Sequence, residues 1–187
     1  MGVDMLVGLR DAWLAVVARD DPGEYGRGEA VMLPSAARLT LSWDGAYRAA
    51  YSDDGIARGV RAGGVGAELR LAGADPERLV ALGLWSRGAD GSYHDGLPRD
   101  GRAYALGYVV DTLDGAAYSR EYPVFWIERL RLGDCVTRGA ARGVCEWIIT
   151  GALLEPRRAD IPWWSARRIG GEDGAEGEEE GEIAGQP

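Results

Sequence analysis

Alternation of apolar and polar residues is the strongest pattern in the chain, and it predicts strands. In residues 38–43, Leu39, Leu41 and Trp43 fall on one face and the polar residues between them fall on the other. Residues 67–71 repeat this two-residue period. Further strands are expected at residues 12–18, 46–51, 104–112, 118–132 and 144–154.

One short helix interrupts the strands. Asp75 is placed to cap the free amides of a first turn, Pro76 suits the first helical position, and Glu77 favours the positive end of the helix dipole. The pattern predicts a helix over about residues 76–85. Strands, one helix and then strands again are typical of an antiparallel β-sandwich or barrel with a flanking helix, a mainly β fold.

Composition divides the chain into three parts. Residues 1–155 carry the predicted strands and form the expected β domain. Residues 156–169 contain two prolines, the arginines Arg157 and Arg158, and the pair Trp163 and Trp164, which favour an extended arm. The arm either docks on a neighbouring subunit or folds back over its own domain. Residues 170–187 alternate glycine with acidic residues and are expected to form a flexible tail.

Most of the net charge belongs to that tail. The formal charge is −9, and residues 170–187 hold seven acidic residues and no basic ones. The remaining 23 acidic residues face 21 basic residues, all of them arginine, so that residues 1–169 carry a charge of −2. Such a balanced body is not expected to bind DNA tightly, although DNA could pass along it without adhering.

The sequence disfavours several classes of protein. No apolar stretch approaches the roughly 18–20 residues needed to span a bilayer, and the N-terminus lacks the basic segment of a signal peptide. We therefore expect synthesis in the cytoplasm and no membrane span. Two cysteines with His94 as the single histidine are too few for a usual structural zinc site.

The candidate chemical groups all have simpler interpretations. The glycine-rich residues 55–66 lack the lysine of a phosphate-binding loop, and Asp53 and Asp54 suit a tight turn. His94 lies near Ser92 and Asp95 within one polar turn, whereas a catalytic triad draws on separate elements. We expect no catalytic residues, no metal site and no cofactor.

Two cysteines frame a nearly mirror-symmetric stretch at residues 136–144. If the chain folds back there, Cys135 and Cys145 lie opposite each other on paired strands. A disulfide is then geometrically possible, but a cytoplasmic protein favours reduced thiols.

The order of these features resembles the major tail proteins of long-tailed (siphovirus-type) phages, the subunits of the tail tube, over roughly residues 3–155. The resemblance rests on weak motifs in a fixed order. They are Val7-Gly8-Leu9, Leu39-Thr40-Leu41, Ala50-Tyr51-Ser52-Asp53-Asp54-Gly55, Leu79-Val80-Ala81-Leu82-Gly83, Tyr104-Ala105-Leu106-Gly107-Tyr108 and Tyr122-Pro123-Val124-Phe125-Trp126.

The resemblance implies a structural virion protein that self-assembles into stacked hexameric rings. These rings form a hollow tube through which DNA passes without specific binding, with tape measure and terminator proteins as further partners. It implies assembly in the host cytoplasm, a final place in the virion tail and no enzymatic activity. The loop at residues 19–34 would contact the next ring; its candidate contact residues are Asp20, Asp21, Glu24, Tyr25, Arg27 and Glu29.

Two other functions stay open. One is a tail terminator or connector, which would form one ring and stop. The other is a small β-barrel that binds a ligand or an adaptor protein, with Trp43, Trp126 and Trp147 lining its pocket. The resemblance does not extend to the arm. From its residues, we expect the arm to dock on a neighbouring subunit through Trp163, Trp164, Arg157 and Arg158.

Overall fold

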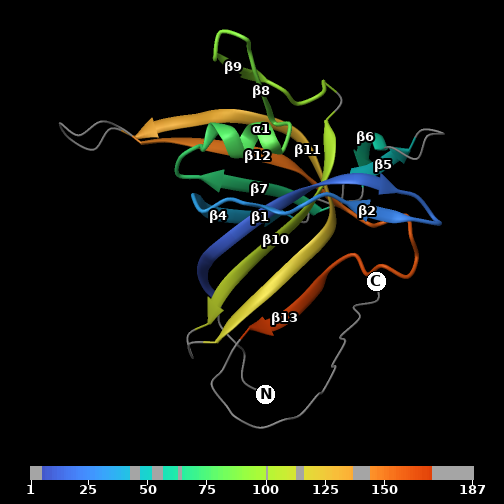
Figure 1. The fold of residues 1–187 in the computed structure, drawn as a ribbon. Coiled ribbons are helices and arrows are strands. Elements are labelled where there is room, and N and C mark those ends of the chain that lie inside the picture. Colours follow the sequence, from blue (N-terminus) through green and yellow to red (C-terminus); the bar gives the residue numbers. More distant parts are fainter. Residues whose placement is uncertain are drawn as a thin grey trace.

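The computed structural model describes residues 6–42, 47–51, 57–62, 65–99, 101–112, 116–136 and 144–169. Within these ranges the protein has one large antiparallel sheet, two small two-stranded sheets and a short helix (Figure 1). This confirms the predicted mainly β, antiparallel fold class with its flanking helix. Trp43, Asp53 and Asp54 lie outside the described residues.

The large sheet carries most of the chain. Its main path runs in the order β2 (Tyr25–Arg27), β1 (Leu6–Asp20), β10 (Arg102–Thr112), β11 (Ala117–Val136), β12 (Val144–Leu154), β7 (Val65–Leu71) and β4 (Ala36–Ser42). β3 (Val31–Met32) joins β1, and β13 (Ser165–Ile169) joins β11. The small sheets are the pairs β5 (Tyr47–Tyr51) with β6 (Ala57–Ala62), and β8 (Trp85–Arg87) with β9 (Tyr93–Asp95).

The main core lies on one face of the large sheet because alternate side chains point to that face. Along β7, buried and half-buried residues alternate without exception, as the sequence predicts. Leu14, Leu69, Tyr104, Phe125 and Ile149 are completely or almost completely buried in this core. The sheet bends around it, and the segment before β4 returns to β1, where the amide of Leu33 donates to the carbonyl of Ala12 at 2.7 Å.

The opposite face of the sheet has a smaller core of its own. Val124, Trp126, Ala152 and Leu154 are buried there, and Tyr25 packs against them. On the same face, Trp13 lies across Gly107, its partner on the neighbouring strand β10. The loop at residues 19–34, which the sequence presents only as a loop, thus contains β2 and β3 and covers part of this second face.

The helix is shorter than predicted. It begins as expected, because the Asp75 side chain accepts from the Glu77 amide at 3.1 Å and Pro76 follows, but α1 (Pro76–Ala81) ends early. Gly83 adopts a φ of +69°, and the amides of Gly83 and Leu84 return to the carbonyls of Val80 and Leu79. These two bonds make a Schellman motif, which stops the helix and sends Trp85 into β8.

β11 changes partner along one of its edges. One edge pairs with β10 throughout residues 117–127. The other edge pairs with β13 at residues 117–121 and with β12 from Val124 onward. The backbone register of β11 and β12 also places Cys135 opposite Cys145, as the sequence predicts if the chain folds back between them.

Gly107 gives a test of the second face. A Cβ on Gly107 would collide with the Trp13 indole, so Gly107→Ala should displace this ring and destabilise the fold by about 1–3 kcal/mol. Gly73→Ala is the matched control, because nothing lies within 4 Å of a Cβ at Gly73. Urea unfolding of both variants measures the difference. Equal free energies of unfolding for the two variants would show that the position of the Trp13 ring does not require a glycine at residue 107.

Candidate functional site

The tip of the β1–β2 hairpin, residues 19–25, is held together by its own side chains. The Asp21 carboxylate accepts from the amides of Gly23 at 2.9 Å and Glu24 at 2.8 Å. Arg19 donates to Asp21 at 2.6 Å and also pairs with Glu24. The hydrogen bond from Arg19 lowers the pKa of Asp21, so the tip keeps its charges over the neutral range.

Two of the predicted contact residues turn toward their own domain. The Tyr25 hydroxyl donates to the Pro123 carbonyl at 2.8 Å, and burial raises the pKa of Tyr25 to about 12. Arg27 pairs with Glu121, and its guanidinium lies 4.8 Å from the centre of the Trp13 ring. Of the predicted set, Glu24, Arg27 and Glu29 are exposed, and Arg27 among them is already paired with Glu121. Contact with a second ring stays a prediction.

The base of the arm meets this tip. The Asp20 carboxylate, at the end of β1, accepts from the Arg157 amide at 2.9 Å. Burial raises the pKa of Asp20, while the hydrogen bond and the charge of Arg157 oppose that rise. Arg158 makes two hydrogen bonds to Asp160, at 2.6 and 2.7 Å. The structure therefore brings together two predicted sites that lie 137 positions apart in sequence.

In this structure the arm folds back on its own domain, which is one of the two alternatives that the sequence leaves open. Trp163 packs on Tyr122 with ring centres 5.7 Å apart, and Trp164 lies under the Arg120 guanidinium at 5.4 Å. Beyond them, β13 adds a strand to the edge of β11, with all five of its residues exposed. Docking of these tryptophans on a neighbouring subunit is untested.

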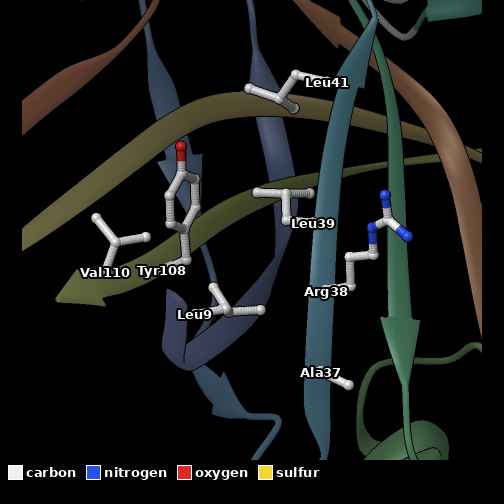
Figure 2. Close-up of a pocket in the computed structure, with 7 residues that line it drawn as sticks. All are labelled: Leu9, Ala37, Arg38, Leu39, Leu41, Tyr108 and Val110. Carbon is white, nitrogen blue, oxygen red and sulfur yellow. The ribbon is translucent and has the colours of Figure 1, made fainter. Parts of the chain in front are cut away.

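A groove marks the seam where the sheet fails to close. β4 pairs with β7 along one edge, and its other edge pairs with no strand among the described residues. Between β4 and the strands β1 and β10 lies a cavity of about 350 Å³ (Figure 2). Leu9, Ala37, Arg38, Leu39, Leu41, Tyr108 and Val110 line it.

The groove is apolar where its side chains converge. Figure 2 shows Leu39 and Leu41 of β4 facing Leu9 and Tyr108, while the Arg38 guanidinium points away toward β7. Across the groove, the described part of β1 before Ala12 pairs with β10 and with no strand on its other side. Two open strand edges thus flank an apolar floor, the arrangement that accepts an added strand. Periodicity identifies Leu39 and Leu41, but the approach of Leu9, Tyr108 and Val110 depends on the register of distant strands.

In the polar turn before β9, Ser92 donates to Asp90 and also contacts His94. Ser92 Oγ lies 2.5 Å from Asp90 Oδ1 and 2.8 Å from His94 Nε2. The Ser92 hydroxyl donates its single proton to the Asp90 carboxylate, and this hydrogen bond lowers the pKa of Asp90. In a catalytic triad the serine would instead donate that proton to the histidine. The described residues contain no group of three or more histidine, cysteine or acidic side chains suited to a metal ion.

The proposed tryptophan pocket is wrong for the residues that can be placed. Trp126 is 2 % exposed and belongs to the second face, whereas Trp147 packs against the main core. These two rings do not line one pocket. Within the described residues, no helix is long and apolar enough to cross a membrane.

No family model matches this chain, and no curated protein matches it with significance. The evidence for function is therefore the geometry of the described residues and the order of the sequence features.

The Asp20–Arg157 bond can be tested by its effect on the arm. Asp20→Ala removes the acceptor and should cost about 0.5–1.5 kcal/mol of stability, with faster amide exchange at residues 157–169. Asp20→Asn keeps an oxygen acceptor and should behave nearly like the wild type. Hydrogen exchange followed by mass spectrometry measures both variants. Unchanged protection in Asp20→Ala would show that other contacts hold the arm.

The tyrosines give a pH prediction. Burial raises the pKa of both Tyr25 and Tyr104 from 10.0 to about 12, so the unfolded chain releases these protons first as the pH rises. The stability that these two neutral phenols contribute is therefore fully present below pH 10 and is lost between about pH 10 and 12. The chain has no lysine to titrate in that range.

Tyr25→Phe should make the fall shallower between pH 10 and 12 because one titrating phenol is gone. Tyr93→Phe, at a tyrosine that is 38 % exposed, is the comparison and should change the slope less. Urea unfolding at a series of alkaline pH values gives the slopes. An identical slope in wild type and Tyr25→Phe would contradict the burial of the Tyr25 hydroxyl.

Proposed function

We propose that this protein is a structural virion protein, the tail-tube subunit of a long-tailed phage. In this proposal it self-assembles into hexameric rings, and the rings stack into a conduit for DNA delivery into the host. Assembly takes place in the host cytoplasm, and the finished protein resides in the virion tail. Its action is binding to copies of itself and to tape measure and terminator proteins, and it catalyses no reaction.

The open seam at β4 is the observation that carries the proposal. Among the residues that the structure describes, the seven-residue strand β4 has one unpaired edge, and such an edge is an aggregation hazard unless something covers it. Leu39 and Leu41 on this strand stay half-buried beside an apolar groove. A strand from a neighbouring copy would satisfy the backbone groups of β4 and remove these leucines from water. Assembly through β4 would supply both gains.

The charge distribution supports a passage for DNA. Residues 1–169 carry a charge of −2, and many arginines are already engaged with acidic partners. Arg10 pairs with Asp111, Arg27 with Glu121, and Arg70 with Glu68 and Glu146. Arginines neutralised in this way contribute few phosphate contacts, and each phosphate contact adds salt-dependent affinity. Such a surface suits DNA in transit.

The alternative function, a tail terminator or connector, would also need the β4 edge to form its single ring. Both proteins need an edge that a neighbour completes, and they differ in whether the rings then stack. The exposed side chains of Glu24 and Glu29 at the β1–β2 hairpin and the loop after it are available for a stacking contact.

Electron microscopy of the purified protein tests the proposal. We expect six-fold rings with a central channel as wide as a DNA duplex, stacked into tubes. Single rings that never stack would favour the terminator or connector instead. A protein that stays monomeric at high concentration, even with its tail partners present, would contradict both.

The seam itself can be tested by a charge. Leu41→Asp puts a carboxylate into the groove, where an incoming strand would have to bury it, so assembly should be abolished or need at least about tenfold more protein. Ile169→Asp adds the same group at an isoleucine that is 41 % exposed on β13, away from β4, and should assemble normally. Sedimentation velocity measures assembly, and circular dichroism checks the fold. Normal assembly of a folded Leu41→Asp would remove the seam from the contact.

A further inference from the structure

A second hollow lies between the β8–β9 hairpin and the paired strands β11 and β12. We call it the aromatic cleft, and its volume is about 320 Å³. Trp85, Tyr93, His94, Asp95, Leu130 and Trp147 line it. Trp85 and Trp147 pack partly on the main core, and the rest of each ring borders the cleft.

The rings of the aromatic cleft meet at steep angles. The centre of the Trp85 ring lies 5.0 Å from that of Trp147 at an interplanar angle of 77°, and 5.8 Å from that of Tyr93 at 40°. Trp85 and Trp147 therefore contact each other edge to face, and the parts of both rings that this contact leaves uncovered border the cleft. An uncovered ring face attracts a cation.

A carboxylate completes the cleft. Asp95 lies directly opposite Trp85 in the register of β8 and β9, so both side chains share one face of the hairpin. The Asp95 carboxylate accepts one hydrogen bond, from the Leu97 amide at 3.0 Å, which leaves it able to accept more. No ion pair among the described residues uses Asp95.

The neighbouring charges are already paired with each other. Arg87 lies opposite Tyr93 and donates to Glu77 at 3.2 Å, and the Tyr93 hydroxyl donates to the same carboxylate at 2.8 Å. Asp90 accepts from Ser92. Among the acidic side chains on the hairpin and the helix beside it, Asp95 is thus the one that lines the aromatic cleft and has only a backbone donor.

The same kinds of group, a tryptophan ring and a carboxylate, hold an arginine elsewhere in this chain. Elsewhere in the molecule Arg27 lies 4.8 Å from the Trp13 ring centre and pairs with Glu121, so tryptophan, carboxylate and guanidinium form one unit. Arg120 lies over Trp164 in the same way. The aromatic cleft has the tryptophans and the carboxylate, but among the described residues no arginine lies over Trp85 or Trp147.

We infer that the aromatic cleft binds the guanidinium of an arginine from a second copy of this chain. All 21 basic side chains are arginine, and Arg129, Arg167 and Arg168 are among those exposed on strands. Cation–π contact with Trp85 and Trp147 and a hydrogen bond to Asp95 would hold the group. This inference rests on the proposed self-association and adds a contact separate from the β4 seam.

Paired carboxylate variants test the contact on the full chain. Asp95→Asn keeps the shape of the cleft but removes its charge, and should raise the concentration needed for assembly about two- to fivefold. Asp90→Asn changes a carboxylate of the same hairpin that serves Ser92, and should assemble like the wild type. Sedimentation velocity gives both concentrations. If the wild type assembles and both variants need the same concentration as the wild type, the inference is overturned and the proposed function still stands.

A direct titration separates the two proposals. N-acetyl-arginine amide should shift the indole NMR signals of Trp85 and Trp147, whereas the neutral N-acetyl-citrulline amide should not, and Asp95→Asn should weaken the arginine effect. If the wild type does not assemble at all, the proposed function fails, and the titration still decides the chemistry of the cleft. Equal shifts with both amides, or none with either, would overturn guanidinium recognition.

Discussion

The rest of the structure depends on the point where β11 exchanges one partner for another. Up to Glu121 its outer edge pairs with β13, and from Val124 it pairs with β12. Tyr122 and Pro123 lie between these two ladders, where a residue without an N–H loses no sheet hydrogen bond. The register of β11 on β10 shifts at the same place, between Tyr104 and Leu106. After the shift, Phe125 and Ile127 face the main core and Val124 and Trp126 face the second one.

The predicted contact sites are organised around this exchange. Tyr25 from the β1–β2 hairpin satisfies the Pro123 carbonyl, and Trp163 from the arm packs on Tyr122. A buried carbonyl without a partner costs about 1–3 kcal/mol, so the Tyr25 hydroxyl stabilises the exchange as well as the hairpin. The hairpin and the arm therefore act as parts of one support, joined again by Asp20 and the Arg157 amide. A role for Tyr25 in subunit contacts would have to leave its hydrogen bond to Pro123 in place.

Local patterns in the sequence predict the strands well and their partners poorly. Alternation identifies β4 and β7 with the correct faces, and the bounds of β12 are those predicted. The helix start follows from Asp75 and Pro76, but the prediction overlooks Gly83, which lies two residues after the helix end and forms the Schellman stop. The Asp20–Arg157 bond and the seam have no local signal, because both depend on register between strands far apart in sequence. The packing of Trp163 and Trp164 is equally hard to predict from local sequence. An extended apolar arm can bury these rings against its own domain or against another one.

The kind of assembly follows from which surfaces can meet. Exposed ion pairs such as Arg19 with Glu24 contribute little free energy, so apolar and backbone groups must supply most of the association energy. If β4 of one copy met β4 of another, the contact would be isologous, and assembly would stop at a dimer. A groove between two different strand edges instead receives a segment from elsewhere on the next copy. An arginine entering the aromatic cleft is also a contact between unlike surfaces. Contacts of this heterologous kind repeat from copy to copy and close into a ring when their rotation divides a full turn, so the number of subunits depends on the angle at the seam rather than on the area buried there.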